Sequence, residues 1–443
     1  LHEHTICGKE SCAEEGHDAE RWKGISTLSE ITSAGRYYLT ESVELTKTWE
    51  CKWDVDLCLN GQTITGADNA AVITVASNKS LNITDCRETG TIRHAAEATG
   101  GCGIDVQGRL TLWNGTITGN PEKGVQVTGT FYMTGGSIAG NADRGVYVRT
   151  NGKFTMSDGT ITGNAKGGVY VAASSKFTMT GGSITGNNTA SGGAGVYVGA
   201  SSTAAGTFIV SGKVQITDNW KNGTLENGRY VQGDSSTRNN VFLSQRTAYP
   251  NNIVTYINIG SDGLSQDARI GVGKASLPTT TSVSFKVATG AATDTSLDYN
   301  TIFQVDADSS KYVISRFGDN LYIDLHSHSW TYSVSDDKAT ITATCSSSHC
   351  PNPAGGSVTI KAPAEAELIY DGSAKAATLE GAFTNDKSNP EISYTMGSEP
   401  GNNLTGGSLP TDAGTYTASI TVGGVTASVD YTIAKAAPTA GDF

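Results

Sequence analysis

Apolar and polar residues alternate in short runs through residues 104–219, and one pattern returns there five times. Its last run reads GTITGN, GSIAGN, GTITGN, GSITGN and, more loosely, VQITDN. The central isoleucines lie 21, 23, 23 and 32 residues apart, at Ile117, Ile138, Ile161, Ile184 and Ile216. Two further alternating runs precede each of them, as Val146–Val148 and Phe154–Met156 do. Strands this short must stack on the next repeat to form a core, which predicts a parallel β-helix.

The register of the repeats predicts columns of like residues. The inward columns are Val125, Val146, Val169 and Val196; Phe131, Phe154, Phe177 and Phe208; and Met133, Met156 and Met179. Another column, at a turn, holds Asn120, Asn141, Asn164, Asn187 and Asn219. Adjacent coils lie about 4.8 Å apart, so we expect these amides to hydrogen-bond from coil to coil as an asparagine ladder.

We divide this all-β chain into four segments. Residues 1–36 form an N-terminal cap, in which Asp18 begins a short amphipathic helix with apolar residues at helical spacing, Trp22, Ile25, Leu28 and Ile31. The helix is expected to cover the open end of the β-helix, which spans residues 37–325. A small cysteine-containing β segment follows at 326–357. Residues 358–443 form an independently folding spacer module and a linker.

The last module carries a turn that is typical of immunoglobulin-like sandwiches. Asp412, Ala413, Gly414, Thr415 and Tyr416 lead into the alternating run ASITV. A D-x-G-x-Y turn into a strand is the tyrosine-corner pattern. We therefore expect a β-sandwich here.

Composition narrows the class of protein. The chain has 443 residues, with 54 glycines and only 10 prolines, which suits an all-β protein with many tight turns. A formal net charge of −12 without a basic cluster argues against binding of nucleic acid. No apolar run reaches membrane-spanning length, so we expect no membrane insertion. The chain starts at Leu1, and we expect further modules of a longer parent protein.

Several segments together resemble large cell-surface proteins of Gram-positive gut bacteria. They are LCLNGQTI, Thr84–Cys86, the GGSITGN coils, HSWTYSVSDDKATITATC, and YDG, PTDAGTYTASITV and YTIAKA of the last module. Such proteins carry a right-handed β-helix followed by immunoglobulin-like modules of the type called MBG. The resemblance implies an extracellular, wall-attached parent protein. It also implies a non-catalytic, adhesin-like function in binding a host or dietary glycan or a host glycoprotein.

The eight cysteines suggest disulfides. Cys58 and Cys86 each precede an aligned isoleucine by six residues, so they should stack on neighbouring coils, within disulfide range. We therefore predict a disulfide between Cys58 and Cys86. We also expect local disulfides in the two C-x4-C motifs, Cys7 with Cys12 and Cys345 with Cys350, because an exported chain favours them. The pairing of Cys51 and Cys102 stays open.

Zinc binding is the alternative for both C-x4-C motifs. Each motif has two histidines in the sequence that could complete a set of nitrogen and sulfur ligands. The sets are His2, His4, Cys7 and Cys12, and His326, His328, Cys345 and Cys350. The spacing is wider than that of a zinc knuckle, so disulfides are the preferred interpretation, and no metal or cofactor is expected.

Catalysis is the alternative function, since β-helix polysaccharide lyases and glycoside hydrolases cluster carboxylates on neighbouring coils. The stacked acids of the regular coils are Glu122 and Asp143. Each is followed by a base, Lys123 or Arg144. A solvated, charge-balanced turn explains these pairs better than an active site does.

A row of tyrosines is the candidate binding surface. Residues between two inward valines face solvent, and Tyr147, Tyr170 and Tyr197 follow Asp105 and Gln126 there. They predict an aromatic ladder about 10 Å long, flanked by polar residues, Gln107, Thr128 and Arg149. Flat rings beside polar donors suit sugar faces, so the expected ligand-binding residues are Tyr147, Tyr170, Tyr197, Gln126 and Arg149. The alternative is a purely structural stalk, in which stacked tyrosines only stabilise the coils.

Overall fold

The computed structural model describes residues 3–6, 8, 20–67, 69–247, 252–274, 276–280, 283–291, 297–307, 311–346, 350, 354–384, 388–397, 404 and 408–437. The chain divides into two compact units, residues 1–325 and 326–443. His2, Cys7, Cys12 and Asp18 lie outside the described residues. Within the described part of the chain, no helix is long and apolar enough to cross a membrane.

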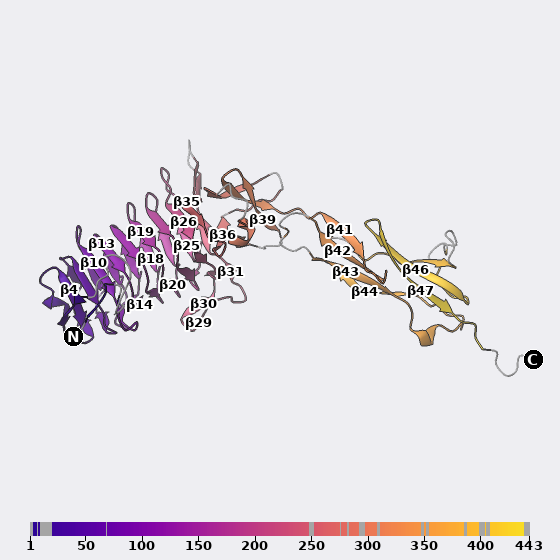
Figure 1. Cartoon of the computed structure of the whole chain (residues 1–443), viewed down its shortest axis with the longest axis horizontal. Coiled ribbons are helices and arrows are strands. Elements are labelled where there is room, and N and C mark those ends of the chain that lie inside the picture. The colour runs from indigo at the N-terminus through magenta and orange to yellow at the C-terminus, as the bar shows by residue number, and fades with distance from the viewer. Residues whose placement is uncertain are drawn as a thin grey trace, which may run out of the picture. The chain divides into compact units, whose positions relative to one another are not determined.

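Residues 1–325 form stacked coils that follow one another in sequence order (Figure 1), and each regular coil crosses three faces. The phenylalanine face is a 13-stranded sheet. Its strands, in spatial order, are β3 (Lys23–Ile25), β4 (Gly35–Leu39), β7 (Val55–Cys58), β10 (Ser80–Thr84), β13 (Arg109–Leu112), β16 (Thr130–Met133), β19 (Lys153–Met156), β22 (Lys176–Met179), β26 (Thr207–Gly212), β35 (Ile257–Leu264), β37 (Phe285–Thr289), β40 (Asn320–Leu325) and β39 (Tyr312–Phe317).

The valine and isoleucine faces belong to one 18-stranded sheet. The valine face contains β6 (Trp49–Cys51), β9 (Ile73–Val75), β12 (Ile104–Val106), β15 (Val125–Val127), β18 (Val146–Val148), β21 (Val169–Val171), β25 (Val196–Val198) and β32 (Val241–Leu243). The isoleucine face contains β5 (Val43–Leu45), β8 (Thr63–Gly66), β11 (Thr91–His94), β14 (Thr116–Thr118), β17 (Ser137–Ala139), β20 (Thr160–Thr162), β23 (Ser183–Thr185) and β27 (Gln215–Ile216). The two faces meet at β36 (Arg269–Lys274), which pairs with β27 and β32 and, beyond them, with β38 (Phe303–Val305).

Columns of identical side chains fill the interior. The four phenylalanine rings of the predicted column stack with centroids 4.7–4.9 Å apart and are fully buried. The valine, methionine and isoleucine columns are also buried and paired in register. The parallel β-helix and its inward columns are therefore confirmed.

The asparagine ladder forms at the turn after the isoleucine face. Each side-chain Nδ2 from Asn120 onward donates to Oδ1 of the asparagine in the next coil, at 2.8–3.0 Å. The backbone N–H of each asparagine donates to the same Oδ1 atom, at 3.0–3.2 Å. The ladder extends one asparagine further than predicted, to Asn240. A neighbouring row of glycines leaves room for it, since a Cβ at Gly145 would lie 2.8 Å from Asn164 Nδ2.

All amides of the ladder point the same way, because the backbone N–H groups fix each Oδ1 as an acceptor. At one end, Asn120 Oδ1 lies 2.8 Å from His94 Nδ1, and His94 Nε2 lies 2.8 Å from the Ala70 carbonyl oxygen. The His94 ring therefore lies between two oxygen acceptors. At the other end, Asn240 donates through its backbone N–H and Nδ2 to the Asp306 carboxylate, each at 2.6 Å. The ladder thus ends on the His94 ring at its carbonyl end and on the Asp306 carboxyl at its N–H end.

The predicted N-terminal helix is wrong. Residues 20–31 contain β2 (Glu20–Arg21), which pairs with β1 (Glu3–His4), then β3 and the 3-10 helix η1 (Leu28–Glu30). Strand β3 lies parallel to β4 and gains the hydrogen bonds of a sheet edge. Gly24 also disfavours a helix, and a Cβ there would lie 2.9 Å from Tyr38 Oη. The apolar residues of the expected helix are still buried, Trp22, Ile25, Leu28 and Ile31.

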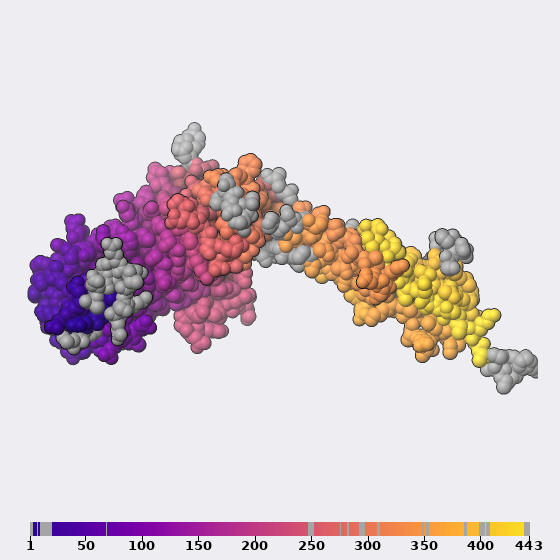
Figure 2. Space-filling model, in the orientation of Figure 1, coloured from indigo at the N-terminus to yellow at the C-terminus, as the bar shows by residue number. Residues whose placement is uncertain are grey.

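The coils become irregular after residue 187. Their insertions form short strands, β24 (Asn188–Thr189), β28 (Trp220–Lys221), β29 (Thr224–Glu226), β30 (Arg229–Val231), β31 (Thr237–Arg238), β33 (Gln245–Thr247) and β34 (Asn252–Val254). The antiparallel β29–β30 hairpin projects from the side of the stack (Figures 1 and 2). Helix α1 (Tyr299–Ile302) precedes β38. Strands β39 and β40 form a hairpin that pairs antiparallel with β37 and ends the phenylalanine face.

Residues 326–443 contain two antiparallel sheets that share one core. The first is β41 (Trp330–Val334), β42 (Thr340–Cys345), β43 (Ala354–Lys361) and β44 (Thr378–Phe383), and the second is β45 (Ser393–Met396), β46 (Gly414–Val422) and β47 (Val425–Ile433). The 3-10 helix η2 (Glu365–Glu367) follows β43. Tyr416 Oη donates to the Asp412 carbonyl oxygen at 2.9 Å, which is the hydrogen bond of a tyrosine corner.

The expected division between residues 357 and 358 is wrong, because it falls inside β43. Strand β42 pairs with β43, and its Ile341 and Ala343 are buried in the core that both sheets share. Residues 326–357 are therefore part of the second unit.

Candidate functional site

The predicted tyrosine ladder forms on the outside of the valine face. Tyr147, Tyr170 and Tyr197 pair in register, and their rings stack with centroids 4.9 and 5.0 Å apart. Each side chain is half-buried, and burial raises the pKa of the Tyr170 hydroxyl. This hydroxyl therefore stays protonated at neutral pH and can donate a hydrogen bond.

A fourth ring extends this row. Phe242 of β32 pairs with Tyr197, and the two ring centroids lie 5.6 Å apart. We call Tyr147, Tyr170, Tyr197 and Phe242 the aromatic column. The sequence prediction missed Phe242 because a long insertion precedes it, although Val241–Leu243 alternates as the earlier strands do. The column ends at Phe242, since its partner in the next strand, Gly273, has no side chain.

The aromatic column does not offer ring faces to sugars along its length, because the rings are stacked on one another. Cations cover part of it: Arg144 Cζ lies 4.8 Å from the Tyr170 ring centroid, and Lys123 Nζ lies 5.9 Å from that of Tyr147. The column carries its ring edges and hydroxyls on the outside of the valine face. Binding of a sugar by these residues stays a prediction.

The polar residues expected beside the tyrosines differ in whether they form hydrogen bonds within the protein. Gln126 precedes Tyr147 in the row, and its Nε2 donates to Asp105 at 3.1 Å. Gln107 donates to the other oxygen of the same carboxylate, also at 3.1 Å. Arg149, directly after β18, is exposed. Gln126 is thus held within the row, whereas Arg149 faces solvent.

The two candidate catalytic acids lie in ion pairs at the turn before the valine face. Glu122 Oε2 is 2.9 Å from Lys123 Nζ, and Asp143 Oδ1 is 3.1 Å from Arg144 Nη1. Lys123 Nζ also lies 4.0 Å from Asp143 Oδ2, which links the two coils. This arrangement is the charge-balanced turn that the sequence favoured.

A pocket of about 540 Å³ lies at the Phe242 end of the aromatic column. We call it the column pocket. Its apolar wall includes Trp220, Phe242 and Leu277, and its cations are Arg238 and Lys274. The other lining residues are mostly polar, among them Gln232, Ser236, Thr237 and Asn239. Burial lowers the pKa of Lys274 to about 8, so its amine is still largely charged at neutral pH.

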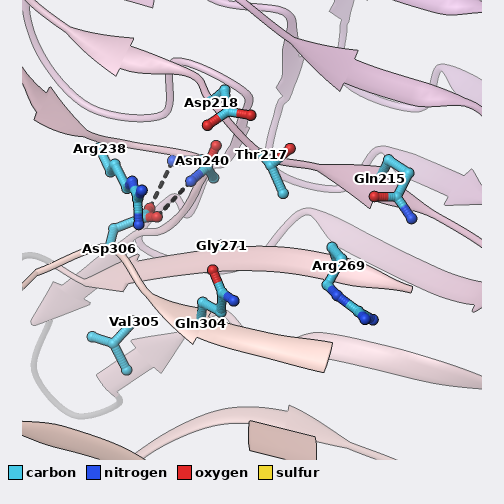
Figure 3. A pocket seen from close by; sticks show the side chains of 10 residues that line it. All are labelled: Gln215, Thr217, Asp218, Arg238, Asn240, Arg269, Gly271, Gln304, Val305 and Asp306. Carbon is cyan, nitrogen blue, oxygen red and sulfur yellow. Dashed lines mark hydrogen bonds between the residues drawn. The ribbon is translucent and has the colours of Figure 1, made fainter. Parts of the chain in front are cut away.

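A smaller pocket of about 230 Å³ shares Arg238 and Asp306 with the column pocket. In Figure 3 these two residues lie at one end and Arg269 at the other, with Gln304 between them. Asp306 accepts two hydrogen bonds from Asn240, the last asparagine of the ladder, as the dashed lines show. Burial raises the pKa of its carboxyl to about 7.

Two histidine–cysteine clusters could hold a metal ion. One consists of His326, His328, Cys345 and Cys350, and their ligand atoms all lie within 4.8 Å of one another. These are the residues that the sequence proposed for one zinc site. The zinc site and the disulfide between Cys345 and Cys350 both stay predictions.

The second cluster differs from the predicted set. His4 lies with Cys58 and Cys86, and their ligand atoms are also within 4.8 Å of one another. Cys58 and Cys86 do come together from neighbouring coils, with their sulfurs 3.5 Å apart, and the disulfide between them stays a prediction. Cys51 and Cys102 are buried elsewhere, and burial raises their thiol pKa values to about 11 and about 12.

Comparison with known families agrees with the coil geometry. Residues 69–248 match the family model described as the right handed beta helix region. The matched segment runs from just before β9 to just after β33, which is less than half of the chain. It includes the aromatic column and all asparagines of the ladder, from Asn120 to Asn240. No curated protein and no solved structure matches the chain.

Proposed function

We propose that this chain is a non-catalytic, extracellular binding protein whose β-helix holds an acidic glycan in the column pocket. The observation that carries the proposal is the pair of cations there. Among the described residues, neither Arg238 nor Lys274 forms an ion pair, although the chain has a formal net charge of −12. Asp306 also lines the pocket, but one carboxyl, itself hydrogen-bonded to Asn240, does not balance two cations. A net positive charge beside aromatic rings suits the carboxylate or sulfate of an acidic sugar.

The aromatic column gives this pocket an extension. Its tyrosine hydroxyls recur at the coil spacing, about 4.8 Å, and lead away from Phe242 along the valine face. A repetitive ligand anchored at Arg238 and Lys274 can continue along that row by hydrogen bonds. The column then contributes hydroxyl donors, and the pocket contributes charge and an apolar wall.

The other candidate functions have less support. A lyase or hydrolase would use Glu122 and Asp143, but both carboxylates are held by neighbouring bases. A purely structural stalk accounts for the stacked rings but not for two cations and a single carboxyl in one pocket. The second unit serves as an immunoglobulin-like, MBG-type spacer in this proposal, and its tyrosine corner supports that assignment.

The test uses the full chain against immobilised acidic glycans, namely oligogalacturonate, sialylated and sulfated oligosaccharides, with neutral glycans of similar length. We expect binding to one acidic class that weakens with added salt. The double variant Arg238→Gln/Lys274→Gln should lose at least about tenfold in affinity, since each charge-assisted hydrogen bond contributes roughly 1.5–3 kcal/mol. The matched control, Lys153→Gln/Lys176→Gln, removes two exposed lysines of the phenylalanine face. Equal losses in both variants would refute the assignment to the pocket.

A second experiment separates the column from the pocket. Changing Tyr147, Tyr170 and Tyr197 to Phe keeps the stacked rings and removes the hydroxyls, whereas changing them to Ser removes both. If the hydroxyls bind the glycan, the Phe variant loses affinity for long oligosaccharides more than for short ones. If the rings only stabilise the coils, the Phe variant binds as the parent does and the Ser variant loses only stability.

A further inference from the structure

The second unit begins with an alternating segment that brings two imidazoles to one side. His326, His328 and Trp330 are separated by single serines, and in an extended chain residues two apart share a side. The His328 ring stacks on the Trp330 ring at 4.8 Å with an interplanar angle of 10°. The His326 ring meets the His328 ring edge-on, with centroids 4.5 Å apart. The two imidazoles are therefore held beside the first residue of β41.

Pairing of β41 with β42 brings a thiol to these imidazoles. Trp330 lies opposite Cys345, the buried last residue of β42. At this open end of the hairpin, Ser346 donates to the Ser329 carbonyl oxygen through its backbone N–H, at 2.8 Å, and through its hydroxyl, at 2.9 Å. Cys350, in the connection to β43, adds a second thiol. Three separate parts of the chain thus converge on one point.

The distances between these groups match the edges of a zinc tetrahedron. With Zn–S about 2.3 Å and Zn–N about 2.0–2.1 Å, tetrahedral geometry places sulfur and nitrogen about 3.6 Å apart. Cys345 Sγ lies 3.9 Å from His326 Nε2, and Cys350 Sγ lies 3.3 Å from His328 Nδ1. All four ligand atoms lie within 4.8 Å of one another, as a single shared ion requires. A disulfide would need only the two sulfurs and would leave the convergence of both imidazoles unexplained.

We propose that His326, His328, Cys345 and Cys350 bind one zinc ion in a Cys2His2 site. Four protein ligands complete the tetrahedron and leave no open position, so the ion has a structural role. It ties the segment before β41 to the end of β42 and to the connection before β43. Zinc and a Cys345–Cys350 disulfide exclude each other, because the metal binds thiolates.

The test measures zinc per full-length chain, purified under reducing conditions and loaded with zinc before gel filtration. It compares variants with the parent chain because His4, Cys58 and Cys86 can also contribute metal. Cys350→Ser should bind one zinc ion fewer than the parent. The control Cys102→Ser, which removes a buried thiol outside both clusters, should bind the same amount as the parent.

Two further measurements, cobalt substitution and exchange of one ligand, distinguish loss of a metal ligand from misfolding of the variant. Cobalt loaded in place of zinc should give a thiolate-to-cobalt charge-transfer band that weakens in Cys350→Ser. Cys350→His, which restores a fourth ligand, should recover the metal equivalent that Cys350→Ser loses. Equal zinc in the parent and Cys350→Ser overturns the proposal. So does a Cys345–Cys350 disulfide, detected by peptide mass, in the zinc-loaded chain.

Discussion

Removal of one amide from the middle of the asparagine ladder should be among the costliest single substitutions in the β-helix. Asn164 is fully buried and accepts hydrogen bonds at its Oδ1 from the backbone N–H and Nδ2 of Asn141. Its own Nδ2 donates to Asn187 Oδ1 and to two carbonyl oxygens, those of Ile138 and Thr162. In Asn164→Ala the two Asn141 donors lose this acceptor inside the protein.

The expected loss follows from those two donors. A buried donor left without its partner costs roughly 1–3 kcal/mol, so Asn164→Ala should lower the free energy of unfolding by about 2–6 kcal/mol. Lys166→Ala, an exposed substitution in the same turn, should change it by less than about 0.5 kcal/mol. Urea denaturation followed by circular dichroism measures both. A loss below about 1 kcal/mol for Asn164→Ala would show that water replaces the amide and would refute the reasoning.

The direction of the ladder makes a sharper test. Asn164→Asp keeps the acceptor for Asn141 but sets an ionised oxygen against Asn187 Oδ1. Burial raises the pKa of such a carboxyl in the folded state, so the variant should be most stable at low pH and lose stability as the pH rises through that value. We therefore expect a larger deficit relative to the parent at pH 8 than at pH 5. A deficit independent of pH would contradict the assigned orientation of the amides.

Three further predictions concern the core, the end of the ladder and the second unit. Phe154→Ala should lower the free energy of unfolding by about 3–5 kcal/mol, and outward-facing Thr155→Ala by far less; equal effects would refute the register. The pKa of the Asp306 carboxyl is raised to about 7 in the folded protein. Its contribution to stability is therefore complete below about pH 4 and is lost as the pH rises through 7. In Asp306→Asn, which cannot ionise, the melting temperature should fall less between pH 5 and 8 than it does in the parent chain. A fragment of residues 326–437 should unfold cooperatively, whereas 358–437, which lacks two strands, should show no transition; a folded shorter fragment would restore the boundary at 358.

The regular coils could be predicted from the sequence because a parallel β-helix aligns one residue with one residue in each coil. The period of 21–23 residues therefore placed Phe154 above Phe131 and Asn164 above Asn141 without any structure. The N-terminal helix failed for the opposite reason. Trp22 and Ile31 fit a helical spacing, but the open edge of β4 offered this segment a strand partner that its local pattern could not show.

The ends of the ladder could not be predicted, because their residues lie outside the regular repeats. Asp306 follows Asn240 by 66 residues, and His94 belongs to an earlier coil with a different turn. Phe242 could not be predicted either, because an insertion separates it from the regular coils. For the histidine–cysteine cluster of the second unit the sequence supplied all four residues, but only the β41–β42 pairing shows that His326 and Cys345 meet.

The residues of the β-helix that the sequence did not predict have a common physical cause, which also explains where the column pocket lies. In a regular coil every outward side chain is flanked, in register, by neighbours about 4.8 Å away, so the surface is a flat row and cannot enclose a ligand. A concavity needs a coil that departs from the repeat. Here the spacing of the isoleucines rises from 23 to 32 residues at Ile216, and a further insertion after Ile216 carries Trp220 and Arg238. Gly273, opposite Phe242, leaves the next outward position without a side chain. The break in the period is thus the sequence signal for the proposed binding site, since insertions in repeat proteins often lie on the face that meets a ligand.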